Sequence, residues 1–178
     1  DVDASFTSAG VEFLGQPFST ASGTIALKRA KLHQVHLNGT VGTRGQVSFD
    51  IDNSDNDMAF TASLDQISAS DLRLLGDAAP AMGGIIKGDA SGRLGDQLLG
   101  EARASVDKLK VRGIDQGRLS TTFALNDQHV DIVFKGFDDE ANGRAVIDWE
   151  HTPKFKLDID FTENDWGPRL GLPPTLRI

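Results

Sequence analysis

The sequence predicts an all-β protein, and three observations support that prediction. Of its 26 acidic residues, 21 are Asp and only 5 are Glu, and the chain contains 19 Gly. Asp and Gly favour turns, whereas Glu is a good helix former. Apolar and polar residues alternate with a period of two, which is typical of a strand with one buried face. Short polar segments separate these alternating stretches, so we expect a mostly antiparallel meander with at most one short helix.

The clearest strand is expected at residues 154–161, where every odd position is a large hydrophobe and every even position is charged. The same alternation covers residues 46–51 and 58–64, and the polar segment 52–57 between them predicts a hairpin. Further strands are expected at residues 2–6, 23–27, 35–41, 86–94, 100–106, 118–125, 130–134 and 145–149.

One short helix is expected where the strand pattern stops. Ser68 and Asp71 have the spacing of a capping box in which Asp takes the place of Glu. Leu72 and Leu75 would cover one face of this helix before Gly76 ends it.

Pro80 and the pair Gly83-Gly84 mark the best boundary between two halves of the chain. Residues 23–32 align without gaps on residues 100–109 and share a Gly and a Lys-Leu pair, which is weak internal similarity. The sequence therefore permits two repeat halves.

We expect one β-sheet domain over residues 1–178, with 1–80 and 81–178 as the halves if the repeat is real. The chain opens at Asp1 without an initiator Met. This start predicts a fragment of a longer protein, in which a signal or anchor could lie upstream.

The composition limits the partners of the chain. Its formal net charge is -8, and Lys and Arg are not clustered, so we expect no nucleic-acid binding. No apolar run approaches the roughly 20 residues needed to cross a bilayer, so no membrane-spanning segment is expected. The absence of Cys excludes disulfides, thiolate metal sites and thiol nucleophiles.

The candidate residues for catalysis or metal binding do not form a convincing site. His33 and His36 would point to opposite faces of a strand. Residues 50–61 resemble a calcium loop, but Asp55 stands where Gly is needed and Thr61 where Glu is needed. Ser91 lacks the context of a nucleophile elbow. We therefore expect no enzyme activity, metal or cofactor, and retain a hydrolase with paired Asp residues only as a minor alternative.

Nearly every expected strand has one apolar face, and no amphipathic helices are available to cover these faces. A sandwich, a closed barrel and a curled sheet with an apolar concave side would each satisfy the pattern. The first two bury the apolar faces internally, whereas the third leaves a groove that needs a ligand. Alternation leaves all three open.

Residues 82–113 carry a resemblance to a known family. They contain a Gly-rich strand, a brief Gly-Asp turn, a strand from Gly100 and the pattern Leu-x-Val-x-Gly, and residues 22–41 and 117–161 are similar in style. This arrangement resembles the recurring unit of the AsmA-like proteins. The resemblance implies a β-taco, which is an elongated curled antiparallel sheet with a hydrophobic concave face.

The AsmA-like resemblance also implies a function. It implies a periplasmic segment of a protein anchored in the inner membrane, which takes part in phospholipid transport and outer-membrane protein assembly. The implied partners are phospholipid or a hydrophobic polypeptide, together with an outer-membrane barrel protein. The alternative is a closed β-sandwich or barrel that acts as an interaction or adhesion module through its acidic loops, without a lipid groove.

The resemblance offers no catalytic residues, and it implies a groove lined by the large residues of the apolar strand faces. These candidate lipid-binding residues are Val47, Phe49, Ile51, Met58, Phe60, Leu64, Leu119, Phe123, Leu125, Ile132, Phe134, Ile147, Trp149, Phe155, Leu157, Ile159 and Phe161.

Overall fold

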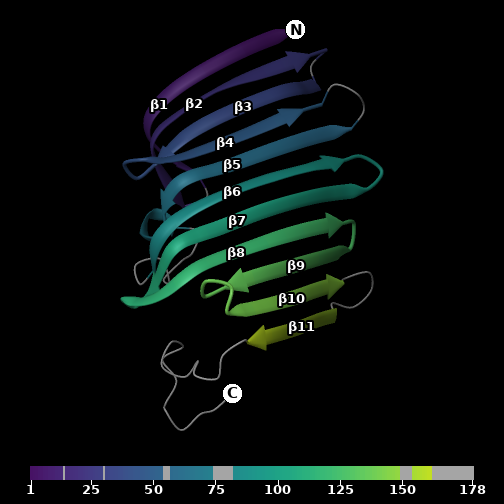
Figure 1. The fold of residues 1–178 in the computed structure, drawn as a ribbon. Coiled ribbons are helices and arrows are strands. Elements are labelled where there is room, and N and C mark those ends of the chain that lie inside the picture. Colours follow the sequence, from purple (N-terminus) through teal and green to yellow (C-terminus); the bar gives the residue numbers. More distant parts are fainter. Residues whose placement is uncertain (14, 30, 54–56, 74–81, 149–153, 162–178) are drawn as a thin grey trace.

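A single antiparallel sheet forms the whole described fold. The computed structural model describes residues 1–13, 15–29, 31–53, 57–73, 82–148 and 154–161. Within them, eleven strands follow one another across the sheet in the order of the sequence (Figure 1). The sheet is open, with β1 and β11 as its two edges. The all-β meander is therefore confirmed, and the described residues form neither a sandwich nor a closed barrel.

The strands are long, and each pairs antiparallel with its neighbours in the chain. They are β1 (Val2–Phe13), β2 (Gln16–Lys28), β3 (Lys31–Val41), β4 (Gly45–Asp52), β5 (Met58–Ser68), β6 (Met82–Leu94), β7 (Leu98–Val111), β8 (Ile114–Asn126), β9 (His129–Gly136), β10 (Ala141–Asp148) and β11 (Lys154–Phe161).

Several strands extend beyond their predicted ends. The expected strands at 2–6 and 23–27 are the outer parts of a hairpin in which β1 and β2 stay paired as far as Phe13 and Gln16. The sequence between these parts is rich in Ser, Thr, Ala and Gly, which do not alternate in polarity. Paired backbone groups satisfy each other whatever the side chains, so the ladder continues where the pattern fades.

The predicted capped helix is wrong in the residues that the structure describes. Residues Ala69–Asp71 form a single 3-10 turn, η1, and Ser68 makes no side-chain capping bond. The expected helix residues Leu75 and Gly76 lie outside the described residues, as does Pro80.

The sheet does not divide at the expected boundary between halves, because β5 and β6 pair directly with each other. The aligned segments also differ in structure. Residues 23–32 pass from β2 through a turn into β3, whereas residues 100–109 lie entirely within β7.

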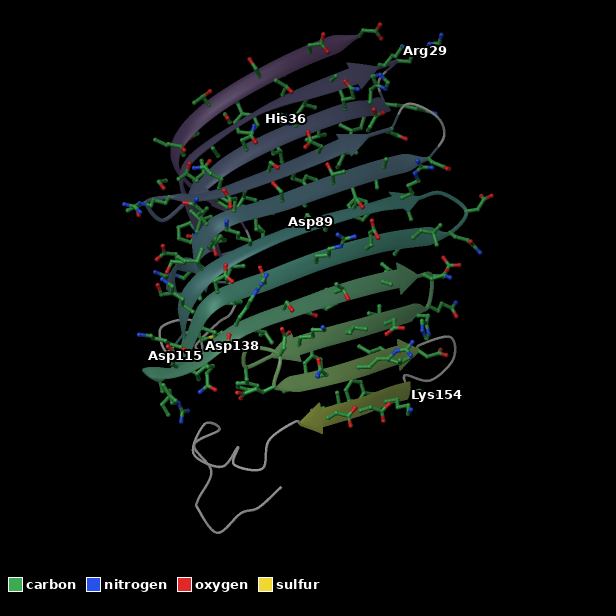
Figure 2. The ribbon with its side chains drawn as sticks, in the orientation of Figure 1. Arg29, His36, Asp89, Asp115, Asp138 and Lys154 are labelled. Atoms are coloured by element: carbon green, nitrogen blue, oxygen red, sulfur yellow. The ribbon has the colours of Figure 1, made fainter. Side chains whose placement is uncertain are left out.

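Strand register gives the sheet two chemically different faces. On one face, directly paired residues are mostly polar, and we call it the polar face. One row on this face contains Thr7, Ser22, Asn38, Ser48, Ser63, Asp89, Arg103, Thr122, Val133, Arg144 and Asp158. Figure 2 labels His36 and Asp89, which both belong to the polar face.

The buried core is small and lies where the chain passes from β5 to β6. Val41, Ile67, Ala69 and Ile86 form one cluster of buried residues. Phe18, Val47, Leu64, Leu72, Met82 and Val106 pack against that cluster. Figure 1 shows the strands bending toward this end of the sheet.

Candidate functional site: the apolar face

The face opposite the polar face is apolar across all eleven strands. Because directly paired residues of neighbouring strands project on the same side, the registers define continuous rows on this face. One row contains Phe6, Gly23, Leu37, Phe49, Ala62, Ala90, Ala102, Phe123, Ile132, Ala145 and Leu157. The next row contains Ala4, Ile25, Val35, Ile51, Phe60, Gly92, Gly100, Leu125, Val130, Ile147 and Phe155. Neither row contains a polar side chain.

A third row on the apolar face is almost as uniform. It contains Ser8, Ala21, Gly39, Val47, Leu64, Gly88, Ala104, Thr121, Phe134, Gly143 and Ile159. Only Ser8 and Thr121 are polar, and the hydroxyl oxygen of Thr121 is buried without a hydrogen-bond partner among the described residues. A hydroxyl in this position indicates how little polar surface the face offers.

The structure brings the predicted groove residues together on the apolar face. Every one of them whose side chain is described belongs to this face by register. The backbone of Phe161 pairs with Ala141, and Trp149 lies outside the described residues. The register places these residues side by side, and their binding of a lipid stays a prediction.

We call the part of the apolar face over β1–β5 the N-terminal apolar region. It contains a hollow of about 500 Å³. The lining of the hollow is apolar apart from a few polar residues. It is lined by Phe6, Val11, Phe13, Gln16, Phe18, Ala21, Ser22, Leu37, Asn38, Gly39, Val41, Val47, Ser48, Phe49, Ala62, Leu64, Ile67 and Leu72. This volume is in the range of pockets that hold a small organic ligand.

One end of the hollow is closed by the segment that follows η1. Leu72 belongs to the lining, and the buried side chain of Gln16 holds its neighbours in place. Gln16 Nε2 donates to the carbonyl oxygen of Asp71 at 3.0 Å, and the backbone N–H of Arg73 donates to Gln16 Oε1 at 2.8 Å. The amide thus satisfies backbone groups that would otherwise be left unpaired beside the core.

Two β-bulges direct additional hydrophobes onto the apolar face. Gln66 has φ 52° and Lys108 has φ 54°, and the pairing register shifts at both positions. An extra residue in a strand reverses the alternation beyond it. Ile67 therefore follows Leu64 on the apolar face, although the two are three residues apart.

Aromatic rings fill the places on the apolar face where glycine supplies no side chain. A Cβ on Gly92 would lie 2.4 Å from Phe60 Cζ, and one on Gly143 would lie 2.0 Å from Phe134 Cζ. Each ring therefore lies over the glycine of the neighbouring strand with which its residue pairs. The central strands β6 and β7 carry mainly Gly and Ala on this face, so the layer of side chains over them is thin.

Over β8–β11, which we call the C-terminal apolar region, the apolar face is open toward the sheet edge. Phe155 is 65% exposed, Leu157 46% and Ile159 42%. Isolated exposed hydrophobes are normal on protein surfaces, whereas a contiguous apolar patch indicates an interaction site. These three residues are neighbours on one strand face and continue the rows above.

Sequence reasoning missed the part of the hollow formed by Phe6, Phe13, Phe18, Leu37 and Leu72. Phe6 and Leu37 carried a usable signal, because each belongs to an alternating stretch that was expected to be a strand. Phe13 and Phe18 face the hollow because β1 and β2 lose regular pairing between Ala9 and Val11, where Gly10 has φ 67°. No local pattern predicts that change of phase.

The polar face is held by exposed hydrogen bonds and ion pairs. Arg144 forms a bidentate pair with Asp131, with its Nε donating to Oδ1 at 2.9 Å and its Nη2 to Oδ2. The hydrogen bond and the positive charge of Arg144 lower the pKa of Asp131, and the same hydrogen bond raises the pKa of Arg144. His36 Nδ1 similarly contacts Asp50 across β3 and β4.

The acidic turn after β9 is held by a hydrogen bond from β8. Asp138, in the acidic turn after β9, accepts the backbone N–H of Arg118 at 2.9 Å and so has a structural role. Among the described residues, no group of three or more His, Asp or Glu side chains is placed to hold a metal ion. None of the described helical segments has the length and hydropathy of a membrane span.

Comparisons with family models, curated proteins and solved structures found no match to this chain. The fold and the apolar face are therefore the observations on which a function can be proposed.

Proposed function

We infer that this chain is a periplasmic segment of an AsmA-like protein, resembling the translocation and assembly module subunit TamB. Its apolar face shields phospholipid acyl chains, or the apolar side chains of nascent outer-membrane proteins, during their passage between the two membranes. The whole protein would be anchored in the inner membrane and would work with an outer-membrane barrel partner.

The observation that carries this proposal is the continuity of the apolar rows across all eleven strands of an open sheet. A sheet of this kind would normally bury its apolar face against a second layer. Here the only cover among the described residues is the segment at η1, which closes one end of the hollow. The remaining face is suited to an apolar ligand that is long rather than compact.

Shielding an acyl chain from water is favourable for each CH₂ group that is covered. Removing one CH₂ group from water is favourable by about 0.8 kcal/mol. Contact with a few CH₂ groups therefore changes affinity by an order of magnitude, since about 1.4 kcal/mol corresponds to tenfold. The polar head group would remain in water, so recognition would depend on the acyl chain.

The test places the same charge on the two faces of the sheet. Phe49→Asp puts a carboxylate in the hollow, whereas Thr24→Asp puts one on the exposed polar face of β2, outside the hollow. Binding of a fluorescent acyl-chain phospholipid analogue is measured by titration, and native mass spectrometry counts the phospholipid bound. We expect Phe49→Asp to weaken binding at least about tenfold, because the charge must stay hydrated where the acyl chain lies.

Thr24→Asp should bind the analogue as the unchanged chain does. Circular dichroism of both variants checks that the sheet is intact. Equal binding by the two variants, or no binding by the unchanged chain, would contradict the proposal. Repeating the titration with an unfolded outer-membrane barrel protein shows whether a polypeptide uses the same face.

A further inference from the structure

Strand β11 forms an edge of the sheet and carries an unusual distribution of charge. In the described part of the chain it pairs with β10 alone. Its polar-face residues are Lys154 and Lys156 followed by Asp158 and Asp160, and all four are exposed. Figure 2 shows Lys154 on this outermost strand. Edge strands repel unwanted partners with charges of one sign, whereas here the two signs are separated along the strand.

Separated charges of this kind are complementary to the same strand running in the opposite direction. When Leu157 lies opposite Leu157 of a second copy, Lys154 faces Asp160 and Lys156 faces Asp158. On the apolar face, Phe155 then faces Ile159. Every directly opposed pair is of opposite charge or entirely apolar, and both kinds of pair stabilise an antiparallel ladder.

The neighbouring registers are less complementary, because each loses opposite-charge pairs and gains a pair of like charges. A shift of two residues in one direction places Lys156 opposite Lys156 of the second copy, and a shift in the other direction places Asp158 opposite Asp158. A shift of one residue would place charged residues on the apolar face. The register centred on Leu157 is therefore favoured over its neighbours.

Symmetry permits this contact without turning over either sheet. A two-fold axis perpendicular to the sheet joins β11 to β11 in antiparallel fashion and leaves both apolar faces on the same side. It is an isologous contact, the type that closes as a dimer. The opposite edge is less suitable, because the only charged residues of β1 are Asp3 and Glu12, which have the same sign.

We propose that β11 is a homodimerisation edge, and that two copies of this chain join through a two-fold antiparallel β11–β11 pair centred on Leu157. The partner is a second copy because the strand is complementary to itself. The resulting sheet carries one uninterrupted apolar face across both copies. This inference is independent of the ligand that the face binds.

The charged residues of β11 are exposed, and in the single copy Lys154 lies opposite Asp148 of β10 and Asp158 opposite Arg144. Lys156 Nζ lies 2.8 Å from Asp158 Oδ2 in the single copy, but their side chains are 74% and 61% exposed. An exposed ion pair contributes little to stability, so exchanging this pair for contacts between copies costs little. Among the described strands, the outward backbone groups of β11 have no ladder partner, and pairing with a second copy supplies one. An interface of one short strand predicts a reversible dimer that depends on concentration.

Charge exchange tests the proposal in the intact chain by sedimentation velocity. The acidic variant carries Lys154→Asp and Lys156→Asp, and the basic variant carries Asp158→Lys and Asp160→Lys. Each variant alone should self-associate at least about tenfold more weakly than the unchanged chain, because like charges now oppose each other. A mixture of the two should restore a dimer that contains one copy of each.

A variant with all four exchanges controls for damage to the sheet. It disturbs the contacts of β11 with Arg144 and Asp148 of β10 as much as the two partial variants together. Its β11 is nevertheless self-complementary again, so it should dimerise. If it stays monomeric while the unchanged chain dimerises, or if the unchanged chain is monomeric at all attainable concentrations, the proposal is wrong.

A cysteine cross-link locates the contact. The chain has no Cys, so Leu157→Cys introduces a single thiol at the two-fold axis. The opposed Cβ atoms of an antiparallel pair lie about 4.5–5.5 Å apart, close to disulfide distance. Mild oxidation should produce a covalent dimer of Leu157→Cys but not of the control Phe6→Cys, which lies on the opposite edge. Equal cross-linking of both variants would contradict pairing through β11.

Discussion

The N-terminal and C-terminal apolar regions belong to the same rows of the same sheet, yet they differ in what covers them. Over β1–β5, η1 and Leu72 pack against the core beside a hollow of about 500 Å³, which Leu72 helps to line. Over β8–β11, the apolar face is most exposed on the edge strand β11, where Phe155 is 65% exposed. In the described part of the chain, the hollow lies beside η1, whereas the exposed edge lies where no such segment covers the apolar face.

The largest expected difference between the two regions is in stability. Ile67→Ala should lower the free energy of unfolding by about 2–5 kcal/mol, since Ile67 is 1% exposed and its removal leaves a cavity in the core. Ile159→Ala, at 42% exposed, should cost less than about 1 kcal/mol. Urea denaturation of both variants measures this difference. Similar losses would show that the two regions are covered alike.

The cover over the N-terminal apolar region should depend on Gln16. Gln16→Ala removes two hydrogen bonds to residues 71–73 and should cost about 1–3 kcal/mol, because the backbone groups of Asp71 and Arg73 lose their partner. Gln46→Ala is the control, since Gln46 is exposed on the polar face. Urea denaturation gives both values, and acyl-probe binding reports the loss of the end wall at Leu72. Unchanged stability in Gln16→Ala would mean that the segment is held by its apolar contacts alone.

The C-terminal apolar region should become more stable when its unpaired hydroxyl is removed. Thr121→Val keeps the shape of the side chain and replaces a buried oxygen that has no hydrogen-bond partner among the described residues. We expect a gain of about 1 kcal/mol in unfolding free energy. Thr122→Val, one residue away on the exposed polar face, should change stability by less than about 0.5 kcal/mol. Destabilisation by Thr121→Val would indicate that the hydroxyl has a partner.

The smallest expected effect concerns the ion pair on the polar face behind the C-terminal apolar region. Because Arg144 lowers the pKa of Asp131 in the folded chain, the pair stabilises the fold above the ordinary Asp pKa. That contribution is lost as the pH falls through the lowered pKa. Asp131→Asn should therefore lower the melting temperature slightly at pH 7, and the difference should shrink below about pH 4. A difference that grows in acid would contradict the assigned pair.

Individual residues show how far sequence reasoning reached. Phe49, Phe123 and Phe155 were assigned to one apolar face from alternation, and the registers place them there. The helix predicted after Ser68 is absent from the described residues, which form the 3-10 turn η1 instead. The packing of η1 against the core determines its backbone conformation more strongly than the capping pattern does. Ile67 was missed as a core residue, since a bulge at Gln66 breaks the alternation just before it.

The sequence by itself determined the fold class and the two faces of the sheet. Both follow from local chemistry, because side chains alternate across a strand and Asp and Gly favour turns. Only the tertiary structure decided that the sheet stays open, where the bulges reverse the alternation, and that the segment after η1 closes one end of a hollow. These features depend on contacts between residues far apart in the chain, such as Gln16 with Asp71, which no local pattern encodes.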